Sequence, residues 1–120
     1  MDISKRIAEL KLRPDFAKNV GMILVHNGVV RQWSRKDGSP VSAVEVSMDM
    51  GVAEGIRREM LARPGIYEIL LEANQGRLQP GDDLLFLVVA GDLRENVKPV
   101  LADLLDRIKA EAVSKREIIG

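Results

Sequence analysis

Hydrophobic positions along the chain follow two periods, one helical and one strand-like. Apolar residues at three- and four-residue spacing after Asp2, a suitable N-cap, predict a short helix over residues 3–11. A second helical pattern covers residues 52–63 and stops at a Pro-Gly pair. The longest begins near Asp92 and places an apolar stripe on one face, which we expect to pack against a sheet.

Strand-like segments separate these helices. Residues 20–31 carry the first strong β pattern, and the Asn-Gly pair within it indicates either a hairpin turn or a glycine bulge in one long strand. Residues 41–48 alternate as a half-buried strand, and residues 66–73 form another. The continuous apolar run over residues 83–90 predicts a central strand.

The order of these segments predicts the fold class. A polar turn over residues 35–40 joins two of the strands, and residues 116–119 add a short terminal strand. Helices and strands with hairpin-like connections indicate an α+β fold with a mostly antiparallel sheet and flanking helices. Residues 1–120 contain no repeat or linker and are long enough for one core, so we expect a single domain.

Composition excludes several classes of function. The 18 basic and 18 acidic side chains give a net charge of zero, which argues against a general nucleic-acid binder. With no cysteine and one histidine, thiolate metal sites, thiol nucleophiles and multi-histidine metal sites are excluded, and we expect no metal or cofactor. No apolar run approaches the ~20 residues of a membrane span, so we expect a cytoplasmic protein without membrane attachment.

Two lysines near the end of the last helix are the first candidates for chemistry. Lys109 and Lys115 are six residues apart, which is ~240° around a continuous helix, so they converge only if the helix ends between them and the chain turns. A lysine becomes an acid, base or nucleophile when burial or a nearby cation lowers its pKa. The ordinary alternative is two solvated charges at a helix C-terminus, where cations are favourable.

Arginines supply candidate anion-binding groups. Arg94 begins the last helix, where backbone donors and a guanidinium suit a phosphate, and Arg31 ends the first strand; both could equally be ordinary exposed side chains. Arg94 and Lys109 are 15 residues apart, or ~22 Å along a helix. If both serve one site, Arg94 must come from a second subunit, which predicts a homodimer.

Three other polar residues have plainer interpretations. We expect Arg35 and Lys36 to lie in a solvated loop. His26 lies inside an apolar strand, where a packed and hydrogen-bonded histidine is more common than a catalytic one.

A series of short motifs in a fixed order resembles the catalytic (large) subunit of molybdopterin synthase, the MoaE family. The series extends from about Gly21 to Glu117, and its order and spacing carry the likeness. Its parts are Gly28-Val29-Val30-Arg31, the strand with Glu45, the helix after Gly51, Pro80-Gly81-Asp82, Arg94, Lys109 and Lys115-Arg116-Glu117. The resemblance favours the bulge over the hairpin in the first strand.

The resemblance implies a fold, an activity and partners. It implies an α/β hammerhead-like fold and two catalytic subunits in a central dimer, which with two carriers makes a heterotetramer. Each subunit binds a small ubiquitin-like sulfur carrier, MoaD-like, whose Gly-Gly thiocarboxylate tail enters the active site. The activity is that of a sulfurtransferase, which moves sulfur to cyclic pyranopterin monophosphate and makes the dithiolene of molybdopterin.

Site residues follow from the matching positions. Lys109 and Lys115 resemble the two active-site lysines of the family, and Arg94 resembles an arginine contributed by the neighbouring subunit. The candidate substrate-binding residues are Arg31, Arg94, His26 and Arg116. Cations held in a water-poor cleft suit a thiocarboxylate, a phosphate and developing oxyanions.

Some positions depart from the family pattern. Leu93 stands where the family usually has histidine, and His26 where an aromatic is common. The segment between the lysines is one residue shorter, and the tail after it is short. These departures define the alternative, a form without activity: a non-catalytic MoaE-like binding or scaffold protein in molybdenum cofactor assembly.

Overall fold

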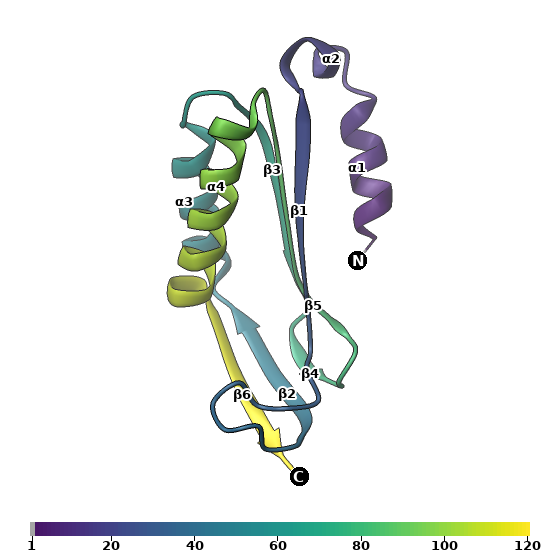
Figure 1. The fold of residues 1–120 in the computed structure, drawn as a ribbon, viewed down its shortest axis with the longest axis vertical. Coiled ribbons are helices and arrows are strands. Elements are labelled where there is room, and N and C mark those ends of the chain that lie inside the picture. The colour runs from purple at the N-terminus through teal and green to yellow at the C-terminus, as the bar shows by residue number, and fades with distance from the viewer. Residues whose placement is uncertain (1) are drawn as a thin grey trace.

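The structure, a computed structural model, describes residues 2–120 and contains two antiparallel sheets of three strands each. The molecule is elongated, with extents of 50 × 25 × 24 Å, and the two sheets lie towards its opposite ends (Figure 1). The elements are α1 (Ile3–Lys11), α2 (Phe16–Asn19), β1 (Met22–Val29), β2 (Val41–Met48), α3 (Met50–Leu61), β3 (Ile66–Ala73), β4 (Gly76–Leu78), β5 (Asp83–Gly91), α4 (Arg94–Arg107), a π-helical turn η1 (Ile108–Ala112) and β6 (Val113–Ile119).

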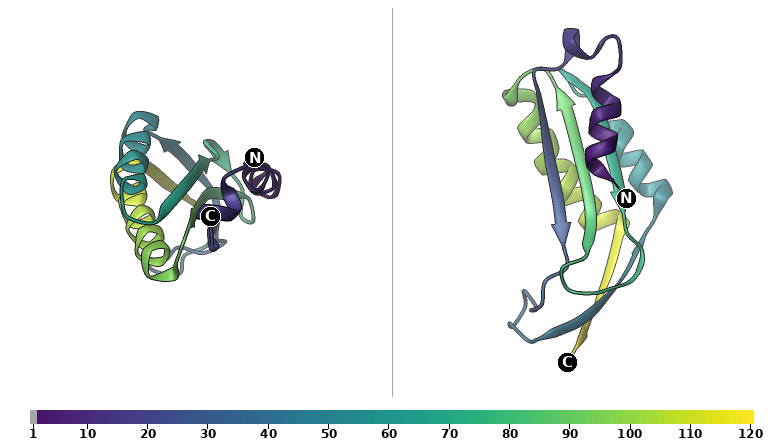
Figure 2. Two further views of the ribbon diagram at one scale, coloured as in Figure 1. Left: turned by 90° about the horizontal axis from the view of Figure 1, so that it is seen from above. Right: turned by 90° about the vertical axis from the view of Figure 1, so that its right-hand side faces the viewer.

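The first sheet has the strand order β1-β5-β3, and β5 is buried along nearly its whole length. Helices α3 and α4 cover one face, while α1 lies against the other (Figure 2). Strand β5 and the apolar stripe of α4 share a core cluster, and burial of its apolar side chains holds the helix in place. Its members from these two elements are Leu84, Leu85, Leu87, Val89, Val97, Val100 and Leu104.

The second sheet has the order β4-β2-β6. Its last strand follows the end of α4 almost directly, because only the η1 turn separates them. Asp49 N–H donates to the Ala112 carbonyl at 2.9 Å, which ties this turn to the start of α3. Helix α4 therefore runs down the first sheet and delivers its C-terminal residues to the junction between the two sheets (Figure 1).

Most of the predicted elements are present. The helix over residues 3–11, the strand over residues 66–73 and the central strand are confirmed, and so is the α+β fold class. The glycine bulge is also confirmed: β1 is one strand whose register shifts between Gly28 and Val29, so the hairpin alternative is wrong. The terminal strand starts earlier than predicted, at Val113, and α2, β4 and η1 were not predicted.

None of the helices within residues 2–120 combines the length and apolar character needed to cross a bilayer. Over the same residues, no three His, Asp or Glu side chains are grouped so that they could hold a metal ion.

Candidate active site

A cavity of about 750 Å³ lies at the junction of the two sheets. This volume is in the range of small-molecule sites. The lining contains five cationic side chains and one carboxylate, so its charge is strongly positive. The lining residues are Gly28, Val29, Arg31, Arg35, Lys36, Leu84, Lys109, Val113, Lys115 and Glu117.

The two lysines reach this cavity from different elements. Lys109 lies in the η1 turn, and Lys115 lies in β6, which begins immediately after that turn. The helix thus ends between them, as their convergence requires. Buried Ile108 and Ala112 anchor η1 in the core, and π-helical turns are frequent at functional sites.

The electrostatic surroundings of Lys115 favour its neutral amine. Partial burial lowers the pKa of Lys115, and the neighbouring cations Arg31 and Lys109 lower it further. Glu117 acts in the opposite direction but does not reverse the shift. At a given pH a larger fraction of Lys115 is therefore deprotonated than of an ordinary lysine, which suits proton transfer or nucleophilic attack.

Arg31 is one of the cations that line the cavity. Its guanidinium carbon is 4.9 Å from the centroid of the Trp33 ring, a cation–π contact that fixes the direction of the arginine. Trp33 itself is 53% exposed and is not among the lining residues of the cavity.

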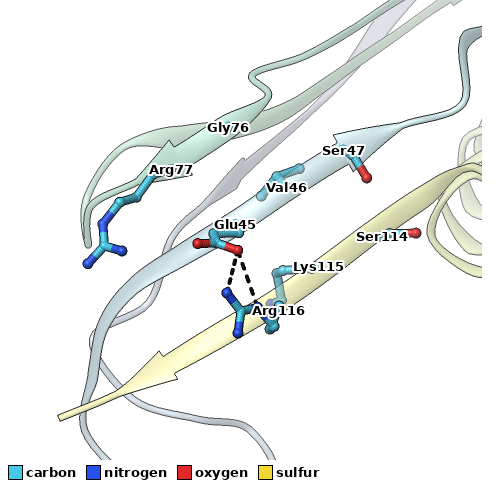
Figure 3. A pocket seen from close by; sticks show the side chains of 8 residues that line it. All are labelled: Glu45, Val46, Ser47, Gly76, Arg77, Ser114, Lys115 and Arg116. Carbon is cyan, nitrogen blue, oxygen red and sulfur yellow. Dashed lines mark hydrogen bonds and ion pairs between the residues drawn. The ribbon is translucent and has the colours of Figure 1, made fainter.

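Arg116 does not line this cavity. Along β6 successive side chains face opposite sides of the sheet, and Lys115 pairs in register with Val46 while Arg116 pairs with Glu45. Arg116 Nη2 lies 2.6 Å from Glu45 Oε2, in a second, separate hollow that Arg77 and Lys115 also line (Figure 3). Glu45 is thus the partner of Arg116, and this guanidinium lowers the pKa of that carboxyl group.

His26 lies next to the cavity without lining it. A Cβ atom added at Gly28 would be 3.0 Å from His26 Nε2, so the imidazole lies against this glycine of the cavity wall. Nε2 is buried and has no hydrogen-bond partner among residues 2–120. Burial, with a smaller contribution from the Lys109 charge, lowers the pKa of His26, which favours the neutral ring.

Arg94 lies at the opposite end of α4 from the cavity (Figure 1). Its side chain is 78% exposed and its Nε is 3.3 Å from Glu95 Oε1. Within one chain Arg94 and Lys109 therefore lie far apart. The spacing of the two residues in the sequence had predicted this separation.

The loop after β1 adds two cations to the cavity that the sequence analysis did not assign to the site. Arg35 and Lys36 both line the cavity, and both are exposed, as expected for a solvated loop. The charge run itself was visible in the sequence, but nothing local indicated that the loop folds back against β6. Ser34, whose hydroxyl donates to Glu117 Oε1 at 2.9 Å, makes that contact.

Comparison with known proteins gives concordant results. The family model described as "MoaE protein" matches residues 1–111, a range that includes Arg31, Arg94 and Lys109 and ends before Lys115. A curated relative, "Probable molybdopterin synthase" from Haloferax volcanii, is 31% identical over 102 residues, which are 81% of this chain. The chain spans 39% of the length of that relative.

Solved structures show the same fold at lower identity. A molybdopterin biosynthesis MoaE protein from Burkholderia ambifaria aligns with a TM-score of 0.75 and 22% identity, over 99% of this chain and 83% of the other. A complex of subunits 1 and 2 of molybdopterin-converting factor from Helicobacter pylori aligns with a TM-score of 0.71 and 16% identity, over 97% of this chain and 78% of the other. Because the family model covers most of the sequence, the chain belongs to the MoaE protein family.

Proposed function

We propose that this chain is the catalytic subunit of a molybdopterin synthase. It takes sulfur from the thiocarboxylated tail of a small ubiquitin-like carrier and transfers it to cyclic pyranopterin monophosphate, which yields the dithiolene of molybdopterin. The observation that carries this proposal is the cavity where Lys109, Lys115 and Arg31 meet in a chain of the MoaE family.

The charges of the reactants suit this cavity. The carrier tail, the cyclic phosphate and any oxyanion formed during transfer are negative, and positive groups held in place stabilise such charge most strongly where water is scarce. We assign anion binding to Lys109 and Arg31. Lys115, whose pKa is lowered, is assigned proton transfer or nucleophilic attack on the acyl carbon.

Partners belong to the same proposal. The structure from Helicobacter pylori is a complex of two subunits of molybdopterin-converting factor, which supports a small-subunit partner for this chain. We further propose a homodimer in which Arg94 of one copy reaches the cavity of the other, since α4 is too long for one chain to supply both groups. Two carriers then complete a heterotetramer, which we expect to be cytoplasmic.

Reconstitution tests the proposal. The purified chain is mixed with thiocarboxylated carrier and cyclic pyranopterin monophosphate, and dithiolene formation is followed by oxidation of the product to a fluorescent pterin. We expect product that increases with the amount of chain. No product at any level of the chain, while an established synthase works with the same carrier, would contradict it.

The second candidate is a non-catalytic protein that binds the carrier tail. Leu93 favours it, because this 59% exposed residue at the start of α4 supplies no titratable group where the family usually has histidine. Saturable binding of the carrier without any turnover would select this candidate over the enzyme.

A further inference from the structure

The loop between β1 and β2 has a fixed shape. Ser34 N–H donates to the Ser39 carbonyl at 2.8 Å, and Gly38 N–H donates to the Ser34 carbonyl at 2.8 Å. Asp37 Oδ1 accepts a further bond from Ser39 N–H at 3.0 Å. These contacts close the loop on itself, so its two cations are presented by a defined backbone.

Ser34 also joins the loop to β6. It is only 4% exposed, and it is the one polar residue that the described part of the chain buries to this extent. Its hydroxyl donates to Glu117 Oε1 at 2.9 Å and accepts from Lys36 N–H at 3.3 Å. One buried hydroxyl therefore connects the backbone of the loop to the strand that carries Lys115.

The two loop cations have no protein counter-charge. Neither Arg35 nor Lys36 takes part in an ion pair within residues 2–120. The only carboxylate on the cavity wall, Glu117, is engaged with Ser34. The loop thus adds two uncompensated charges to a cavity that already holds Arg31, Lys109 and Lys115.

We propose that the Ser34–Glu117 hydrogen bond is a latch that holds Arg35 and Lys36 over the cavity as a second anion subsite, which takes the phosphate of the substrate. This inference rests on the proposed function. The inner cations receive the thiocarboxylate of the carrier, so both reactants are bound through separate positive groups. A guanidinium beside an ammonium suits a phosphate, whose several oxygens accept hydrogen bonds from both.

Steady-state kinetics test the subsite. The double substitution Arg35→Ala, Lys36→Ala should raise KM for the pterin phosphate about tenfold or more, since hydrogen bonds to charged groups are lost, and leave KM for the carrier unchanged. The matched control is Lys11→Ala, Arg58→Ala, which removes the same charges from exposed positions on α1 and α3 and should change neither KM. A rise in KM for the carrier alone, or no change in either, would overturn the subsite.

Binding of inorganic phosphate tests the latch without any turnover. In a titration followed by amide NMR shifts of residues 34–39, Ser34→Ala and Glu117→Ala should weaken phosphate binding several-fold. Glu117→Gln keeps an oxygen acceptor for Ser34 and should bind at least as tightly as the parent. Equal weakening in Glu117→Ala and Glu117→Gln, or no weakening in Ser34→Ala with its thermal midpoint retained, would overturn the latch.

The two experiments separate this inference from the proposed function. If no mixture yields product but phosphate binds to the loop as expected, the catalytic assignment fails and the subsite stands. If sulfur transfer proceeds and the loop variants behave like the parent, the subsite fails and the catalytic assignment stands.

Discussion

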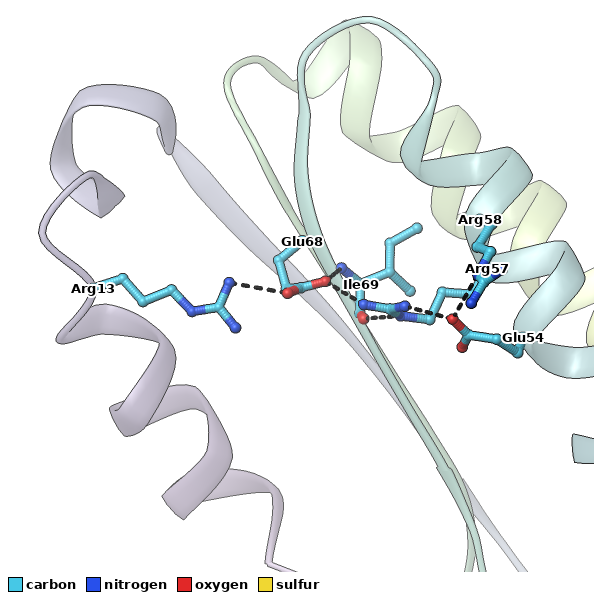
Figure 4. A network of polar contacts seen from close by, with 6 residues as sticks. All are labelled: Arg13, Glu54, Arg57, Arg58, Glu68 and Ile69. Atoms are coloured by element: carbon cyan, nitrogen blue, oxygen red, sulfur yellow. Dashed lines mark hydrogen bonds and ion pairs between the residues drawn. The ribbon is translucent and has the colours of Figure 1, made fainter.

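Two clusters of charged side chains in this molecule are built in opposite ways. Around Glu68 on β3, every guanidinium has a counter-charge: Arg13 Nη1 is 2.9 Å from Glu68 Oε2, Arg57 Nη2 is 2.7 Å from Glu68 Oε1, and Glu54 pairs with Arg57 at 3.0 Å (Figure 4). In the cavity at the junction of the sheets, five cations face one carboxylate, which a serine already occupies.

The difference between the clusters indicates different roles: paired charges stabilise the fold, whereas unpaired cations are available to a ligand. In the Glu68 cluster, the carboxylate joins Arg13, which follows α1, to Arg57 of α3 on the other side of the sheet, so the charges serve the fold. Cations left together without partners repel one another and cost stability. Such an arrangement is expected where an anion is to be bound, as we propose for the cavity.

The largest effect is expected at Lys109. In Lys109→Ala, sulfur transfer should fall by about 100-fold or more, the range for removal of a positioned proton-transfer or charge-stabilising group. Because the side chain is exposed, the free energy of unfolding should change by no more than about 0.5 kcal/mol. Assays run beside Lys11→Ala provide the comparison; full activity in Lys109→Ala would remove the lysine from the mechanism.

In the cluster around Glu68, a substitution should lower the stability of the protein and leave its activity unchanged. In Arg57→Ala, the half-buried Glu68 loses its partner on α3 and the Ile69 carbonyl loses its bond from Arg57 Nε, 2.7 Å long. We expect the free energy of unfolding in urea to fall by about 1–3 kcal/mol, with carrier binding unaltered. Arg35→Ala should change stability by less than about 0.5 kcal/mol. Equal losses in both variants would erase the distinction between the clusters.

Titration of Lys115 sharpens the comparison. Because burial and the Arg31 charge both lower the pKa of Lys115, its amine should deprotonate at lower pH than that of a lysine in a short peptide. Arg31→Ala removes one of these causes and should raise the pKa of Lys115. At a given pH, a smaller fraction of the Lys115 amine is then neutral than in the parent. NMR of the lysine side chains across the alkaline range measures the pKa of Lys115 in the parent and in Arg31→Ala. An unchanged titration in Arg31→Ala would contradict the claim that the Arg31 charge lowers this pKa.

The smallest effect is expected at Arg116. Its pair with Glu45 is exposed, and such pairs contribute roughly 0–1 kcal/mol. Arg116→Ala should therefore leave the thermal midpoint nearly unchanged and both KM values within about twofold. A large increase in either KM would show that Arg116 takes part in substrate binding, as the sequence analysis expected.

Apolar periodicity was sufficient to predict the strands of the first sheet and the helices α1, α3 and α4, but not the order in which the strands pair. Strand β5 and helix α4 bury long apolar runs, and burial of this kind is visible in the sequence. Strand β6 was harder to predict, because Lys115 faces the cavity where a core residue would ordinarily stand and Arg116 faces solvent, so the segment lacks strand alternation. Strand β4, with three residues, is too short for any pattern.

The candidate site was only partly predictable for a related reason. The resemblance and the helix geometry identified Lys109 and Lys115, and the structure places both on one cavity. In our proposal the contribution of Arg35 and Lys36 depends on the long-range bond between Ser34 and Glu117, which are 83 positions apart in the chain. No local pattern of charge encodes a contact of that kind.

A crystal structure of the chain grown with phosphate is the most direct test of the claim that the unpaired cations form an anion site. We predict an anion in the cavity within hydrogen-bonding distance of its cations, Arg35 and Lys36 among them, and none beside the paired arginine Arg57. An empty cavity with its ammonium groups turned to solvent, at a phosphate concentration that fills other sites, would contradict the account.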